Sequence, residues 1–113
     1  MYTVIRKYDL VPGTLEEFIQ HVQASLVPIL SRMPGFRAYS LVEIGDNEVA
    51  AISSFETLAD AKASAPQTVA WIAEHTEMFF QGFSKPMAGV VRVQSKPARL
   101  SLTIYEELLQ GSF

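Results

Sequence analysis

The sequence predicts an α+β fold, a ferredoxin-like chain of order β-α-β-β-α-β with one antiparallel sheet. Two segments have the apolar spacing of amphipathic helices, and they separate three strand-like regions. In the strand-like regions at 36–55 and 85–95, apolar residues fall on both odd and even positions, so both faces of the sheet need cover. Two helices are enough for one face. We therefore expect a second copy of the chain to cover the other face.

A strand at residues 2–8 and a helix are predicted to open the chain. The strand is rich in β-branched and aromatic residues, and Pro12-Gly13 ends it. Thr14, followed three residues later by Glu17, forms a capping-box pattern at the helix start. Pro28 interrupts the helical pattern and predicts a kink or a split. The helix carries one apolar stripe, composed of Leu15, Phe18, Ile19, Val22, Leu26, Ile29, Leu30 and Met33.

Two strands joined by a turn at Gly45-Asp46-Asn47 follow, and then a second helix. A capping box from Thr57 to Asp60 opens this helix, and we expect Pro66 to begin a renewed helix after an alanine-rich start. Gly82 is predicted to end it before the last strand. The predicted stripe comprises Val69, Ile72, Thr76, Phe79 and Phe83, with Trp71, His75 and Met78 beside it.

The 113 residues are divided into one ferredoxin-like domain at 1–95 and a C-terminal appendage at 96–113. The appendage carries enough apolar residues that we expect it to pack on its own subunit or on the partner subunit. Its spacing fits either a strand or a helix.

Composition narrows the possible functions. The net charge of −3, with basic residues scattered along the chain, argues against nucleic acid as a partner. There is no cysteine, and no histidine or carboxylate cluster has metal-ligand spacing, so we expect no metal and no bound cofactor. The N-terminal residues lack the pattern of a signal peptide, and no apolar run is long enough to span a membrane. We therefore expect a cytoplasmic protein.

A set of turn formers and core aromatics resembles the antibiotic biosynthesis monooxygenase-like family over about residues 2–95. The matching residues are Pro34-Gly35-Phe36, Tyr39, the Gly45 turn, Phe55-Glu56 before an alanine-rich helix, Trp71, and Gly89-Val90-Val91-Arg92-Val93. This resemblance implies a dimeric α/β barrel, in which two ferredoxin-like sheets pack face to face with the helices outside. It also implies relatives that are cofactor-free oxygenases of polycyclic aromatic molecules or haem-degrading enzymes.

Two departures from that family bear on activity. Many oxygenase-like members carry Trp just after the third strand, where this chain has Phe55. The haem-degrading members combine Asn, Trp and His at spacings that Trp71 and His75, one helical turn apart, do not reproduce. The resemblance therefore implies the scaffold, and it does not transfer either catalytic signature.

His75 is the candidate catalytic residue, as a general base for a phenolic or enol proton or as an axial haem ligand. The alternative is a histidine satisfied by a neighbouring glutamate or by water. Trp71 is a candidate for stacking on a flat ligand, or else fills the core. Tyr39 either offers its phenol to a ligand or packs in the dimer. Phe55 and Phe79 complete the predicted substrate-binding set.

Two functions are the main candidates for these residues, and haem binding through His75 is a third. The first is an uncharacterised monooxygenase-like enzyme, a cofactor-independent oxygenase acting on a small aromatic or polyketide-like molecule between helices and sheet. The second is a non-catalytic homodimer that binds a small apolar molecule or serves as a structural module. A cavity of useful size with His75 at its wall would favour the enzyme.

Overall fold

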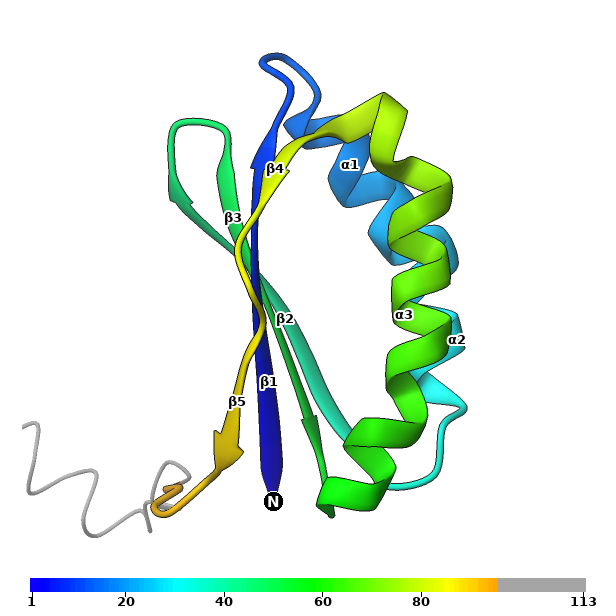
Figure 1. Cartoon of the computed structure of the whole chain (residues 1–113), viewed down its shortest axis with the longest axis vertical. Helices are drawn as coiled ribbons and strands as arrows, with labels where there is room; N and C mark the ends of the chain where they lie inside the picture. Colours follow the sequence, from blue (N-terminus) through cyan, green and yellow to red (C-terminus); the bar gives the residue numbers. More distant parts are fainter. Residues whose placement is uncertain (96–113) are drawn as a thin grey trace, which may run out of the picture.

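The computed structural model describes residues 1–95 of the chain (Figure 1). The elements are β1 (Tyr2–Leu10), α1 (Leu15–His21), the π-helical segment η1 (Val22–Leu26), α2 (Val27–Ser31), β2 (Phe36–Gly45), β3 (Glu48–Phe55), α3 (Leu58–Phe79), β4 (Phe80–Phe83) and β5 (Met87–Val90). The α+β ferredoxin-like order is confirmed, with the first helical unit in three segments and the last strand in two. The predicted appendage at 96–113 lies outside the described residues.

The sheet is antiparallel throughout and has β1 at its centre. Its order is β2-β3-β1-β4, and β5 also pairs with β1. Along β1, Tyr2 lies opposite Phe55 of β3 and Tyr8 lies opposite Val49. The predicted hairpin between β2 and β3 is confirmed, and Asn47 in its turn has a positive φ of 58°, a conformation that asparagine tolerates better than most residues.

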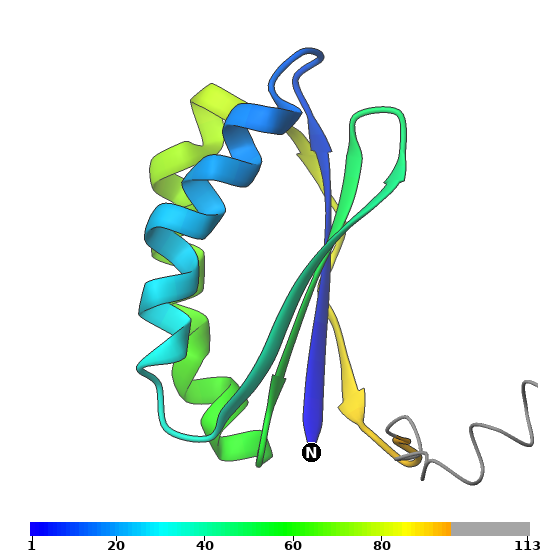
Figure 2. The same ribbon diagram turned by 180° about the vertical axis from the view of Figure 1, so that it is seen from behind.

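All helices lie on one face of the sheet, as the two opposite views show (Figures 1 and 2). Side chains from β1, β3 and the helices form one core on that face, with Leu10, Phe18 and Phe55 almost fully buried. The described helices leave the other face uncovered. Val42 and Met87, on that open face, are 40% and 50% exposed. The prediction that the chain's own helices suffice for one face is thus confirmed.

The first helix begins at the predicted residue but without the predicted cap. The Thr14 hydroxyl donates to the Val11 carbonyl at 2.6 Å, so it is turned back into the preceding turn and caps no helical N–H. Pro28 does split the helical unit. The Val27 N–H donates to the Val22 carbonyl in a π-type bond, and Pro28 falls in the first turn of α2, where a missing N–H costs little.

The second helix departs from its prediction at two places. Pro66 begins no renewed helix, because α3 runs through it as one 22-residue helix. Pro66 lies on the exposed side of α3, where water can satisfy the carbonyl that it leaves without a partner. The helix also ends at Phe79, before Gly82. Phe80 and Phe83 pair with β1 instead and bring their rings to 4.9 and 6.1 Å from Tyr8.

The cap at the start of α3 is confirmed and gives a test of local stability. The Thr57 hydroxyl accepts a hydrogen bond from the Asp60 N–H at 3.1 Å. We expect Thr57→Ala to lower the free energy of unfolding by about 1 kcal/mol, as other lost N-caps do, measured by chemical denaturation. Thr57→Ser, which keeps the hydroxyl, is the matched control and should unfold like the parent. Equal stability of the alanine variant would show that this cap contributes nothing.

Candidate functional site

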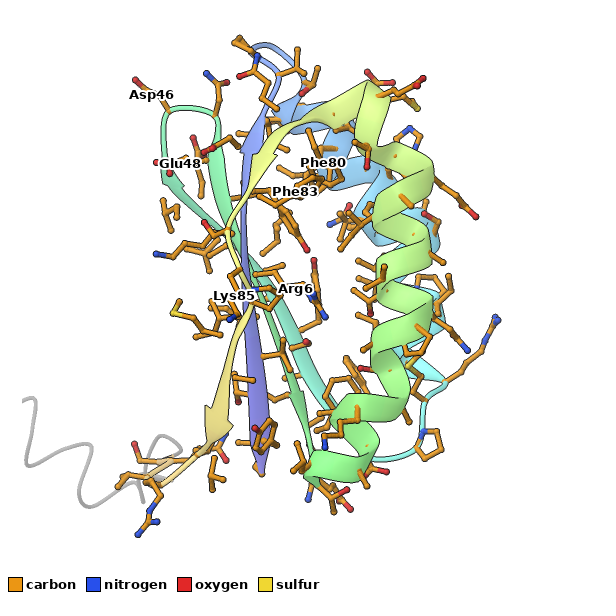
Figure 3. All side chains as sticks on the ribbon, viewed as in Figure 1. Arg6, Asp46, Glu48, Phe80, Phe83 and Lys85 are labelled. Atoms are coloured by element: carbon orange, nitrogen blue, oxygen red, sulfur yellow. The ribbon has the colours of Figure 1, made fainter. Side chains whose placement is uncertain are left out.

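Arg6 stands on the helix-facing side of the central strand. Side chains alternate along a strand, and the even-numbered neighbours Val4, Tyr8 and Leu10 all pack in or against the core. Arg6 shares their side and is half-buried, opposite Ala51 of β3. Figure 3 shows it on the side of the sheet that the helices cover. A cation has therefore been placed in an otherwise apolar layer.

An enclosed void lies between this part of the sheet and the helices. Its volume is about 10 Å³, room for about one water molecule. Its polar walls come from three strands and α3: Arg6, Tyr8, Tyr39, Ser53 and Thr68. Its apolar walls are Phe18, Leu26, Leu30, Ala51 and Trp71. The void is thus a small polar pocket at the centre of the core layer.

The two tyrosines of the void are held in their neutral form. Burial raises the pKa of Tyr8 to about 12, and the nearby Arg6 charge opposes that rise. Burial raises the pKa of Tyr39 still further above its usual value, and the neighbouring Tyr8 adds to that rise. At neutral pH both hydroxyls therefore carry their protons and are able to donate hydrogen bonds.

A larger groove adjoins the void on the outer side of Tyr39. It has a volume of about 380 Å³ and runs between the first helical unit and β2. Its walls are Ile19, Val22, Gln23, Val27, Tyr39 and Leu41. Tyr39 lines both hollows, so it lies where the groove and the void adjoin. The predicted space between helices and sheet therefore exists as an open groove and a closed inner void.

Two of the predicted ligand-binding residues meet at the void. Trp71 is 4% exposed, and its Nε1–H donates to the Ser25 hydroxyl at 2.7 Å across to η1. Trp71 and Tyr39 both line the void. Phe55 and Phe79 are buried core residues, packed against Phe36 and Phe18 respectively, and line neither hollow.

His75 lies in the seam between α3 and α1. Its ring stacks on Trp71 with the ring centroids 4.1 Å apart, and it lies 5.4 Å from the ring of His21. Its Nδ1 is 2.8 Å from the Trp71 carbonyl oxygen, so Nδ1 carries the proton in that bond. His75 lines neither the void nor the groove. The structure therefore brings it against Trp71 but not to the hollows.

Arg6 is the functional candidate that the sequence analysis missed. The basic residues are scattered along the sequence, and only Arg6 and Lys7 are adjacent, so no single one of them stands out. Lys7 is exposed and points to the opposite face of the sheet, so the two have different environments. The sequence signal that identifies Arg6 is a positive charge on the same side of the first strand as Val4 and Tyr8. A charge on the apolar side of a strand is uncommon enough to mark a site.

Comparison with known proteins places the chain among a recognised group. A family model described as antibiotic biosynthesis monooxygenase matches residues 1–67. No curated protein sequence matches the chain significantly.

No helix among residues 1–95 has both the length and the apolar character needed to cross a membrane.

Solved structures from several bacteria share the fold. SnoaB, a cofactor-independent oxygenase from Streptomyces nogalater, is 16% identical over 86% of this chain and 97% of its own, with a TM-score of 0.65. A putative antibiotic biosynthesis monooxygenase from Chloroflexus aurantiacus is 20% identical over 84% and 96%, with a TM-score of 0.64. The NE2512 protein of unknown function from Nitrosomonas europaea is 19% identical over 87% and 95%, with a TM-score of 0.65. These similarities establish the fold.

The raised pKa of Tyr8 predicts that the protein loses stability in alkaline solution. The folded state binds the Tyr8 proton more tightly than the unfolded state, whose tyrosine pKa is 10.0. Between about pH 10 and about pH 12 the unfolded state therefore holds fewer protons, and the free energy of unfolding falls as pH rises. Denaturant unfolding across this range should show that fall, with a smaller slope in Tyr8→Phe. The same slope in both proteins would contradict the assignment to Tyr8.

Proposed function

Since the chain belongs to the antibiotic biosynthesis monooxygenase family, we propose that it is a cofactor-independent oxygenase of a small aromatic or polyketide-like molecule. The observation that carries this proposal is the donor-rich void beside an open groove, between the helices and the sheet. The apolar walls suit a flat ligand, and Arg6, Tyr8 and Tyr39 suit an oxygen atom on which negative charge develops.

The reaction needs little from the protein beyond binding and proton removal. A substrate CH₂ group activated by a carbonyl and aromatic rings loses a proton and becomes a carbanion, which is also an enolate. The carbanion gives electrons to O₂, one oxygen atom bonds to that carbon as a new C=O, and the other leaves as water with the two hydrogens. Hydrogen-bond donors at the enolate oxygen favour the first step, and a dry site protects the intermediate.

His75 remains the proposed general base, with a condition set by its position. Its Nδ1 is hydrogen-bonded to the Trp71 carbonyl and its ring is stacked on the Trp71 indole. A substrate proton must therefore come to the Nε2 side of His75, at the edge of the Trp71 ring.

A second candidate, a non-catalytic binding module, is supported by the size of the void. At about 10 Å³, the inner space has room for about one water molecule, so side chains must move before a ligand can reach Arg6 from the groove. A protein that only packs its core, or that binds an apolar molecule in the groove, needs nothing more.

We further propose that the protein is a homodimer joined through the open face of the sheet. Across that face Ile5 lies opposite Ile52 and Val42 lies opposite Ala50, which makes an apolar area beside polar positions such as Lys7 and Ser40. A hollow of about 320 Å³ lined by Ile5 and residues 87–91 adds a surface that a second copy can fill. The face-to-face packing of two sheets would complete the barrel that the resemblance implies.

Oxygen consumption with anthrone as the probe tests the enzyme. We expect uptake of one O₂ for each anthraquinone formed, faster than in buffer or with heat-denatured protein. His75→Ala should reduce the rate about 100-fold, in the range of a lost general base. Binding of anthrone without O₂ uptake would favour the binding module. The absence of both binding and uptake would contradict both candidates.

Sedimentation or light scattering tests the dimer. We expect the parent protein to have twice the chain mass of 12.5 kDa and Val42→Lys to have the mass of one chain, because a charge at an apolar interface core is costly. Val69→Lys is the matched control, since Val69 is 53% exposed on α3 and should leave the mass unchanged. A monomeric parent would contradict the proposed interface.

A further inference from the structure

The Arg6 guanidinium has no counter-charge in the layer that it occupies. Within residues 1–95 the ion pairs join Glu17 to His21 and Arg37 to Glu56, and neither involves Arg6. No acidic residue lines the void. The segment Ser84–Pro86 joins β4 to β5 alongside β1, and its one charged residue is the cation Lys85 (Figure 3). A half-buried cation therefore stands among donors and apolar groups.

The guanidinium also has unused hydrogen-bonding capacity. Arg6 makes no side-chain hydrogen bond to another residue of 1–95, whereas Thr68 in the same wall is bonded to the Ser64 carbonyl. Every fully buried side-chain nitrogen or oxygen in this range has a partner, so the guanidinium nitrogens must reach accessible space. The void that Arg6 lines is one such space. An arginine presents five N–H donors in a planar fork that matches a carboxylate.

The neighbouring tyrosines add donors. Both phenols are neutral at physiological pH and line the void together with Arg6. The site thus combines one positive charge with two phenol O–H groups, two aliphatic hydroxyls and no negative charge. Such a set stabilises an anionic oxygen and gives much less to a neutral molecule of the same shape.

Tyr39 connects this inner set with the groove. Tyr39 is half-buried and lines both hollows. Rotation of its side chain would join about 380 Å³ of apolar groove to the donors around Arg6. A flat aromatic body would then lie along Val22, Val27 and Leu41, with one oxygen substituent directed inward.

We propose that Arg6 makes the pocket selective for aromatic ligands with an ionised oxygen, a carboxylate, phenolate or enolate, which pairs with its guanidinium. This selectivity rests on the proposed function, because it uses the same pocket between helices and sheet. In the oxygenase, the same pairing lowers the cost of forming the enolate. Arg6 is then the residue that determines which charge state of a ligand the protein retains.

The test compares two ligands of nearly equal shape, 2-naphthoate and 2-naphthamide, near neutral pH. Calorimetric titration gives the affinities. The indole N–H resonance of Trp71, the chain's one tryptophan, reports whether each ligand reaches the void that Trp71 lines. We expect the parent to bind naphthoate about 10- to 100-fold more tightly than naphthamide, the range for a charge-assisted hydrogen bond.

Arg6→Gln should abolish this preference and leave naphthamide binding within about two-fold of the parent. The substitution removes the positive charge, to which only the carboxylate responds strongly. Arg6→Leu, which suits the apolar layer and should fold at least as well, must lose the preference too. Arg32→Gln removes the same charge from an exposed position at the end of α2 and is the matched control. It should retain the full preference.

The outcomes separate this inference from the proposed function. If both ligands shift the Trp71 resonance with equal affinity, or if Arg6→Gln and Arg6→Leu keep the preference, the pocket stands and selectivity by Arg6 is wrong. If neither ligand shifts the Trp71 resonance, the pocket of the proposed function fails, and the role of Arg6 fails with it.

Discussion

The pairing of β1 with its neighbours is the constraint on which the rest of the structure depends. This strand is hydrogen-bonded on one side to β3 and on the other to β4 and β5. Because side chains alternate along a strand, one register decides which residues of β1 enter the core. It places Tyr8 and Leu10 under the helices, leaves Ile5 on the open face and directs Arg6 inward. A shift of the β1 register by one residue would turn Arg6 to the open face and its apolar neighbour Ile5 toward the helices.

Local chemistry explains which elements could be predicted. The hairpin was predictable because Gly45-Asp46-Asn47 provides residues that accept turn conformations, and Asn47 does take a positive φ. The Thr57 cap was predictable because Thr57 and Asp60 interact within one helical turn. The Thr14 pattern looked equivalent, but its hydroxyl found an acceptor in the preceding turn at Val11. Sequence spacing cannot distinguish these two hydrogen bonds, since both are local.

The error at the end of α3 and the placement of His75 have a tertiary cause. The helical spacing of Phe79 and Phe83 is real, but pairing of Phe83 with Tyr8 of β1, far away in sequence, converts that segment into a strand. Trp71 and Tyr39 are large aromatic residues, which stand out in a sequence, and both line the void. His75 is one turn from Trp71, yet it faces His21 of α1 and not the sheet. Which neighbour a helix face meets is a property of the packing.

The π-helical segment η1 gives the groove a wall of an unusual kind. Val22, Val27 and Gln23 line the groove, and the Val27 N–H bonds to the Val22 carbonyl across five residues instead of four. A π turn is an insertion of one residue into an α-helix. Moving that insertion along the helix by one step rotates the side chains it passes by about 100°. The position of this insertion therefore decides which side chains of the wall face Tyr39, and Pro28 follows it directly in the first turn of α2.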